Sequence, residues 1–306
     1  MRHTMTKNDE HEIRIGKNHQ VTVTDMGHLL EILHMKRRNS ECHIRKIDAE
    51  RYIFLGTGEI FEFEKSANRS ENENSLRQTF KNLRYLINNN FKGLPNELFV
   101  TLTFAKDSYD PEMVYKDFNK FIKRLKYRYK GETTIDYINV VEPHASGQFH
   151  THTLLRFNDL KKIYIDNKDM AKMWSHGFVT VKSLKDVDNI GAYVSAYLAD
   201  IEVTQENAVS VMSDGREVSV KEVDGQKKMF AKGGRLKYYP PGMNIFRKSK
   251  GIEYPVREEM TYEKAQKKVG SAKPHFKKSY TVERDNFKNT ITIEQYNLKR
   301  TDNTQK

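Results

Sequence analysis

Two histidines and a glutamate are the residues whose types and spacing point most clearly to metal chemistry. His150 and His152 lie two apart in the run 149–157, which reads FHTHTLLRF. Alternate side chains of a strand leave the same face, so both imidazoles would project together, about 6.6 Å apart along the backbone. Glu142 closes the preceding strand-like run, and the short loop between the runs would return its carboxylate to the histidines. Such a site could hold a divalent cation that still accepts water or a phosphate oxygen.

A less specific explanation competes with this one. A single histidine on a strand is usually a polar residue at a sheet surface, although His-x-His with a paired glutamate fits that explanation less well. His144 lies in the loop between the runs, and we expect it not to be a ligand. The expected ion is Mg²⁺ or Mn²⁺, and imidazole ligands suit Mn²⁺ at least as well.

A pair of tyrosines forms the second candidate group. Tyr193 and Tyr197 are four residues apart in the run GAYVSAY, so on a helix both hydroxyls can address one phosphate. Tyr193 lies farther from the centre of the apolar stripe of this predicted helix than Tyr197, and is therefore expected to be more accessible. A glycine inside a helix costs about 1 kcal/mol, and we attribute Gly191 to a close approach between helix and sheet. Taken alone, such a pair is more often packing than catalysis.

The segments around these candidates alternate between strand and helix patterns. Runs rich in β-branched and aromatic residues predict strands, and apolar residues at helical spacing predict helices. The expected strands are 98–104, 135–142, 149–157 and 178–183, and the expected helices follow Pro111 and cover 167–174 and 186–200. This β-α-β-β-α-β-α order suits an α+β, ferredoxin-like antiparallel sheet with helices on one face.

Weaker patterns flank this central region. We expect a hairpin at 52–63, a helix from Leu76 to Asn88–Asn90, a hairpin within 209–223 around Asp214-Gly215, and a strand at 290–293. The chain is accordingly divided into an N-terminal extension (1–95), a central catalytic domain (96–202) and a basic, aromatic C-terminal extension (203–306). The last residues, from about Lys299, are expected to form a disordered tail.

Composition narrows the class of protein. The 306 residues include 53 Lys and Arg against 41 Asp and Glu, a formal charge of +12 that favours a polyanionic partner. One cysteine, Cys42, excludes a disulfide framework and a multi-cysteine zinc site. No apolar signal or membrane-spanning run occurs, so we expect a cytoplasmic protein without membrane contact.

Two basic segments are candidates for binding nucleic acid. The predicted helix after Pro111 carries seven cations, of which Lys116, Lys120, Lys123 and Arg124 are our candidates; a solvated helix face is the alternative. The segment 235–250 mixes cations with aromatic residues, and single strands bind such surfaces through backbone charge and base stacking. Its candidates are Arg235, Lys237, Tyr238, Tyr239 and Arg247, with packing against the sheet as the alternative for the aromatic rings.

Three motifs in order carry a family resemblance: the strand F-x-T-L-T-F from Phe99, the block E-x7-H-x-H from Glu142, and the helix Y-x3-Y from Tyr193. Together they resemble rolling-circle replication initiators of the HUH endonuclease superfamily, of the type found in Gram-positive plasmids, integrative elements and phages. The segment 235–252 also resembles the region that follows the tyrosine helix in plasmid-type members.

The resemblance implies roles for individual residues. His150 and His152 would bind the metal, with Glu142 as the third ligand. Tyr193 would be the nucleophile and Tyr197 a second one. Thr151 stands where the family usually has a bulky hydrophobic residue. Many relatives also carry lysines just before the second tyrosine and three residues after it, whereas this chain has Ala196 and Asp200. The cation that would assist the phosphate or the tyrosinate therefore has no candidate in the sequence.

The expected function is metal-dependent nicking and strand transfer of single-stranded or supercoiled origin DNA through a 5′-phosphotyrosine, as in an endonuclease that starts and ends rolling-circle replication. No G-x-x-x-x-G-K-[ST] motif is present, so strand separation would need supercoiling or a host helicase. The alternatives are a transposase or relaxase of the same superfamily, or a catalytically inactive DNA-binding repressor. Relaxases usually place the tyrosine before the histidines, unlike this chain. The sequence leaves open the origin sequence, the oligomeric state and the kind of genetic element.

Overall fold

The structure is a computed structural model of the 306-residue chain. It describes residues 5–6, 14–38, 43–48, 50–63, 73–144, 146–185, 187, 189–192, 194, 200–205, 207–213, 217–223, 226–231, 233–240, 242–284 and 287–300. The chain forms two compact units. One combines Met1–Lys65 with Pro255–Lys306, and the other is Ser66–Tyr254. This partition differs from the linear division expected from composition, because the two ends of the chain share one unit. Within the described part, no helix has the length and apolar character needed to cross a membrane.

A five-stranded antiparallel sheet organises the unit Ser66–Tyr254. Its strand order is β10-β7-β9-β8-β14. The strands are β7 (Glu97–Leu102), β8 (Ile135–Pro143), β9 (Phe149–Phe157), β10 (Val179–Ser183) and β14 (Phe246–Lys248). The connections β7-α2-β8 and β9-α3-β10 use helices α2 (Pro111–Arg128) and α3 (Asn167–Trp174). This is the α+β, ferredoxin-like arrangement predicted from the sequence, with β14 added beside β8.

Local signals fix both crossover helices. Asp110 caps α2 by accepting from the backbone N–H of Glu112, and Pro111 occupies the first turn, where its missing donor costs nothing. Asp166 caps α3 in the same way, and the helix ends at Ser175 in the left-handed conformation. The chain therefore begins and ends these helices where the sequence predicts.

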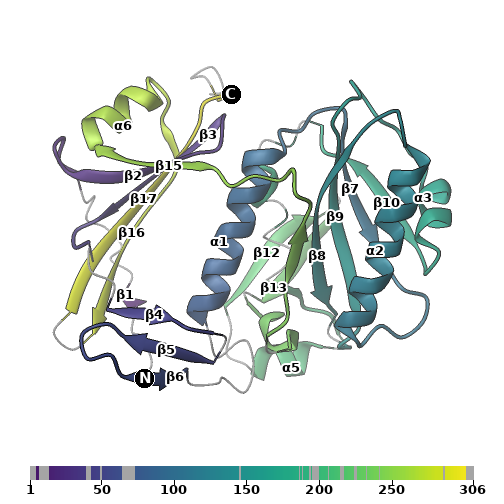
Figure 1. The fold of residues 1–306 in the computed structure, drawn as a ribbon, viewed down its shortest axis with the longest axis horizontal. Helices are drawn as coiled ribbons and strands as arrows, with labels where there is room; N and C mark the ends of the chain where they lie inside the picture. The colour runs from purple at the N-terminus through teal and green to yellow at the C-terminus, as the bar shows by residue number, and fades with distance from the viewer. Residues whose placement is uncertain are drawn as a thin grey trace. The chain divides into compact units, whose positions relative to one another are not determined.

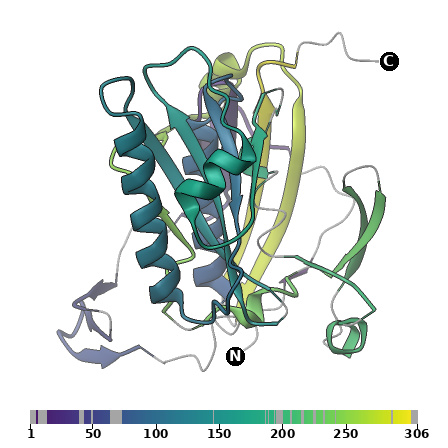
Figure 2. The ribbon, with the colours of Figure 1, turned by 90° about the vertical axis from the view of Figure 1, so that its right-hand side faces the viewer.

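Helices cover both faces of the sheet (Figure 1). Phe118 and Phe121 of α2 and Trp174 of α3 share an apolar core with Leu155 and Phe157 of β9. Figure 2 shows α2 and α3 in front of the strands. On the other face, α1 (Glu73–Asn90) contributes to a second core, which includes Phe99 and Leu154. The helix expected from Leu76 is thus confirmed, and it packs on the face that α2 and α3 leave open.

A smaller sheet of this unit corrects one sequence prediction. The hairpin expected within 209–223 is wrong, because α5 (Ala208–Ser213) is helical and β12 (Val218–Val223) pairs instead with β13 (Gln226–Ala231). The two residues between these strands are Asp224 and Gly225, a second Asp-Gly signal that suits a two-residue hairpin better than the one at 214–215. Strand β11 (Ile201–Glu202) completes the order β11-β13-β12, and the 3₁₀ helix η2 (Leu236–Tyr238) follows.

The other unit joins the two ends of the chain in a six-stranded sheet. Its order is β1-β16-β17-β3-β2-β15, and every printed pairing is antiparallel. The strands are β1 (Met5–Thr6), β2 (Gln20–Asp25), β3 (Leu29–Met35), β15 (Val256–Thr261), β16 (Pro274–Arg284) and β17 (Phe287–Asn297), with helix α6 (Tyr262–Val269). The expected strand at 290–293 is confirmed as part of β17, whose long pairing with β16 is yellow in Figure 2.

A small sheet of three short strands also belongs to this unit. Strands β4 (Ile44–Lys46), β5 (Arg51–Phe54) and β6 (Ile60–Glu62) pair in the order β4-β5-β6. Its β5–β6 pair is the hairpin predicted at 52–63, with Gly58 in the left-handed conformation. Of the expected C-terminal tail, residues 301–306 lie outside the described residues.

Candidate metal centre

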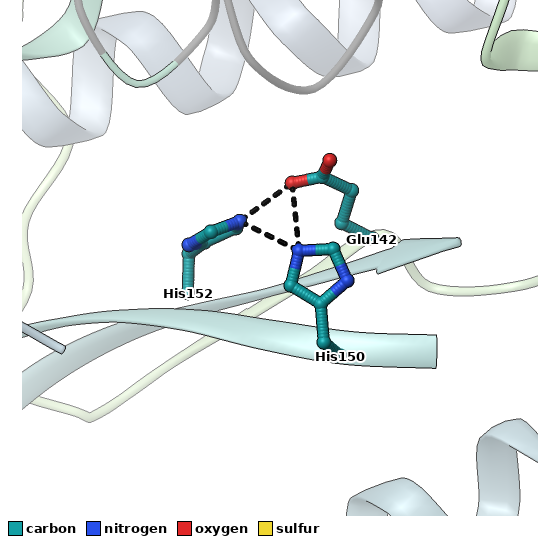
Figure 3. A group of neighbouring side chains, drawn as sticks. All are labelled: Glu142, His150 and His152. Carbon is teal, nitrogen blue, oxygen red and sulfur yellow. Dashed lines mark hydrogen bonds and ion pairs between the residues drawn. The ribbon is translucent and has the colours of Figure 1, made fainter. Parts of the chain in front are cut away.

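Strand pairing brings the three predicted ligands together. In the β8–β9 ladder, Glu142 lies directly opposite His150, and His152 follows two residues later on the same face of β9. Figure 3 shows the three side chains converging from these two strands. The sequence therefore located the cluster because the residue spacing and the hairpin register together determine it.

The ligand atoms of the cluster lie close to one another. Glu142 Oε2 is 2.6 Å from His152 Nε2 and 3.4 Å from His150 Nε2. The two Nε2 atoms are 3.0 Å apart, and the group is the only set of three or more potential ligands within 4.8 Å among the described residues. Ligand bonds of about 2.0–2.2 Å place neighbouring donors of one ion roughly 3 Å apart. The cluster can therefore bind a metal ion after shifts of a few tenths of an ångström.

The protonation states also suit metal binding. Burial alone would raise the pKa of Glu142, but the two histidines beside it outweigh burial and hold that pKa well below its usual range. Burial lowers the pKa of His150, although Glu142 opposes this effect. A carboxylate and a neutral imidazole are the forms that coordinate metals.

Neighbouring side chains orient His152 more firmly than His150. Thr101 Oγ1 of β7 lies 3.1 Å from His152 Nδ1, and the ring of Phe99 stacks on the imidazole at a centroid distance of 5.4 Å. Such contacts fix the ring of a ligand histidine and its tautomer. His150 Nδ1 is buried and has no hydrogen-bond partner in the described part of the chain. Its ring packs against His144, with centroids 4.1 Å apart.

The two predicted tyrosines, Tyr193 and Tyr197, lie outside the described residues. The chain around Tyr193 is helical at 190–192 and at 194. Ile190 and Val194 are buried in the core that α1 forms with Phe99 and Leu154, on the face of the sheet that carries the histidines. The described neighbours of Tyr193 therefore pack on the same side of the sheet as the cluster.

Gly191 explains how this segment is held, and it corrects one expectation. A Cβ at Gly191 would lie 2.7 Å from Asn88 Oδ1 and 2.8 Å from the carbonyl oxygen of Arg84. The Gly191 N–H donates to Asn88 Oδ1 at 2.8 Å. The close approach predicted for this glycine exists, but its partner is helix α1 and not the sheet.

The segment that carries the cluster matches a known family. Residues 97–202 match the family model of the replication-associated protein ORF2. The match begins with β7, ends with β11 and spans about a third of the chain, including the three clustered residues and both tyrosines. No curated protein and no solved structure matches the chain.

Arg235 lies outside the segment that matches this family but contacts the cluster. Its Nη1 is 2.5 Å from Glu142 Oε1, the carboxylate oxygen that the histidines do not share. It also donates to the carbonyl oxygens of Pro143, at 2.8 Å, and Asp200, at 3.2 Å. With only 11% of its side chain exposed, Arg235 is a cation built into the cluster. The sequence suggested DNA contact for this residue and gave no sign of its carboxylate partner.

The other basic candidates fall in different places. Lys116, Lys120, Lys123 and Arg124 lie on α2, across the sheet from the cluster and on the far side from the histidines. Lys120 pairs with Asp117 at 3.0 Å, and Arg124 donates to the Trp174 carbonyl. These four residues therefore do not extend the surface around the cluster.

The aromatic segment divides between core and surface. Tyr239 is 1% exposed and belongs to the apolar core, so it offers no ring for base stacking in this structure. Tyr238 is half-buried beneath the ammonium group of Lys237, 5.3 Å from its ring centroid. The guanidinium of Arg247 stacks on the Tyr115 ring at 3.5 Å. Packing, the alternative considered for these rings, describes Tyr239.

Proposed function

We propose that this protein nicks single-stranded DNA in a metal-dependent reaction and joins the 5′ end covalently to a tyrosine. One observation carries the proposal. The Glu142–His150–His152 cluster lies, with ligand spacing, inside the segment that matches a replication-associated family. The buried neighbours of Tyr193 on the same side of the sheet support it.

The chain's own residues prepare the site. A divalent ion held by the cluster would withdraw electrons from a non-bridging oxygen of the target phosphate. Thr101 and Phe99 hold His152 in orientation, and Arg235 holds Glu142 and keeps its second oxygen neutralised. The buried position of Glu142 and His150 limits competition from water.

Tyr193 would supply the nucleophile. A phenol has a pKa near 10, so it needs an electrophilic phosphate and loses its proton as it attacks. The phenolate oxygen forms a bond to phosphorus, the bond from phosphorus to the 3′ oxygen breaks, and the leaving 3′ oxygen takes up a proton. The products are a 5′-phosphotyrosine and a free 3′ hydroxyl, which conserve the phosphodiester energy for rejoining. Tyr197 would accept the strand in a second transfer.

These steps suit initiation and termination of rolling-circle replication at an origin. The match to replication-associated proteins and the +12 charge support origin DNA as the substrate. The 3′ hydroxyl can prime synthesis, and the covalent end can be returned when the copied strand is complete. The helicase would come from the host.

A covalent-adduct assay tests the proposal. Single-stranded oligonucleotides tiled across the DNA that flanks the gene are incubated with the purified protein and Mn²⁺, then separated on a denaturing gel. We expect one oligonucleotide to give a protein–DNA adduct that EDTA abolishes. Absence of any adduct across the tiled set, with binding retained, would favour the inactive repressor. Plasmid replication and element excision, measured side by side, separate an initiator from a transposase.

A further inference from the structure

A lysine-lined groove lies at the other end of β8 from the metal cluster. The groove has a volume of about 640 Å³ and is formed by three segments: the end of α2, the start of β8 and the residues after β14. Lys126 and Lys130 line one side, and Lys248 and Lys250 line another. We propose that this groove binds backbone phosphates of the DNA flanking the nick, an inference that rests on the proposed function for the identity of the polyanion.

The lysines are not neutralised by the protein. None of the four ammonium groups is paired with a carboxylate of the described residues. Lys126 and Lys248 lie over the rings of Tyr137 and Tyr254 at about 6 Å. Lys130 and Lys250 are exposed, and the structure gives their side chains no partner in the described chain. Lysines at the end of a helix are common because they oppose the helix dipole, but this explains only the pair from α2.

The one acidic residue in the groove is already satisfied. Asp136 Oδ2 accepts from Arg156 at 2.9 Å and from Asn158 at 3.0 Å, and Oδ1 accepts from Ser249 at 2.7 Å. Its charge is therefore directed to Arg156, and the four lysines keep an excess of positive charge around the groove. Gathering like charges without a partner is unfavourable, and an anionic ligand would relieve that repulsion.

The chemistry of the lining favours a chain of phosphates. Lysine presents a compact, hydrated charge without the fork geometry that fixes one bidentate ligand. Lysines spread over three segments suit successive backbone phosphates, which contribute affinity without reading the base sequence.

The position of the groove predicts where these phosphates lie. Asp136 and Glu142 are six residues apart on β8, which corresponds to about 20 Å at 3.3 Å per residue. At 3.4 Å per nucleotide of a B-form strand, this is about six nucleotides. The groove would therefore contact DNA about half a helical turn from the cleaved bond.

Charge removal at the groove tests the inference. Lys130→Ala/Lys250→Ala removes the two lysines that make no other contact, and Lys161→Ala/Lys168→Ala removes two exposed lysines elsewhere in the same unit. Binding to fluorescein-labelled, mixed-sequence 30-mers, single-stranded and duplex, is measured by anisotropy over a series of KCl concentrations. We expect the groove variant alone to lose affinity on the order of tenfold, with the slope of log K against log[salt] smaller by about 1.4 to 1.8.

The outcomes separate this inference from the proposed function. Wild-type binding and slope in the groove variant overturn it, and so does an equal loss in both variants, which would reflect net charge alone. Weaker binding of the groove variant together with normal adduct formation on the shortest reactive oligonucleotide supports it. If no oligonucleotide forms an adduct, the nicking proposal fails, while the anisotropy comparison still decides whether the groove binds DNA.

Discussion

Arg235 Nη1 lies 2.5 Å from Glu142 Oε1, while Glu142 Oε2 faces the two histidines. The carboxylate is therefore divided between a permanent cation on one side and the predicted metal position on the other. The sequence left the assisting cation unidentified, and the structure places Arg235 next to the cluster from a segment beyond the matched family region.

Replacing Arg235 should destabilise the metal-free protein. Arg235→Met keeps much of the side-chain length but leaves a buried carboxylate without its cation, which typically costs about 3–5 kcal/mol. We expect a lower Tm without metal and a partial recovery with Mn²⁺, because a bound ion would again neutralise Glu142. Arg235→Lys retains the charge and should lie between the two. Identical responses of wild type and Arg235→Met to Mn²⁺ would argue against this coupling.

Removing either ligand histidine should abolish metal binding. His150→Ala and His152→Ala each take away one of three donors, so titration calorimetry with Mn²⁺ should show at least a 100-fold weaker Kd, or no binding, and adduct formation should be lost. His144→Ala is the matched control, because His144 packs on His150 but contributes no ligand to the cluster. Normal cleavage by both ligand variants in EDTA would refute the metal site.

The two tyrosines should have different tasks. Tyr193→Phe removes only a hydroxyl, so this variant should fold and bind DNA yet form no initial adduct. Tyr197→Phe should still nick but accumulate linear multimers instead of unit circles. Peptide mapping of the first adduct checks the order, and nucleotide recovered on Tyr197 alone would reverse the assignment.

Adding a methyl group at Gly191 tests the contact with α1. Helix propensity alone predicts that Gly191→Ala stabilises the protein by about 1 kcal/mol. The close Asn88 and Arg84 atoms predict the opposite sign, a loss of about 1–3 kcal/mol from overpacking. Urea unfolding measures the sign directly. Ala192→Gly, at an exposed neighbouring position, calibrates propensity in the same helix, and a stabilised Gly191→Ala protein would contradict the contact.

Acid should weaken the network around Asp136. Burial raises the pKa of Asp136, but hydrogen bonds from Ser249, Asn158 and Arg156 outweigh it, so the pKa is lowered in the folded state. The resulting stabilisation is present above the unfolded value, near 3.9, and is lost as pH falls through the lower folded value. The stability difference between wild type and Asp136→Asn should therefore shrink below about pH 4. Urea midpoints at pH 7 and pH 3 measure it.

Local patterns were sufficient for the central domain and its cluster. Period-two alternation placed His150 and His152 on one face, and a short hairpin fixed Glu142 opposite them. Capping residues and apolar spacing likewise determined α2 and α3. In these elements the decisive contacts lie within a few residues or across one tight connection.

Long-range contacts were beyond the same reasoning. Arg235 is 92 residues from Pro143, whose carbonyl it contacts, and no periodicity connects them. Tyr239 looked like a stacking ring because its neighbours are basic, yet it is buried in the core. Gln295 donates to Glu31 across 264 residues, so the pairing of β17 with β3 depends on tertiary assembly and not on either strand alone.

The pairing of β3 with β17 sets an order of events during synthesis. Strand β3 lies between β2 and β17, so a ribosome produces β2 and β3 long before the strand that covers the other edge of β3. All strands of the five-stranded sheet, by contrast, have been translated by Lys248. Until β17 emerges, β3 presents Leu30, Ile32 and unpaired backbone groups, the features that promote edge-to-edge aggregation. The nascent chain therefore depends on its last strand to protect one of its first.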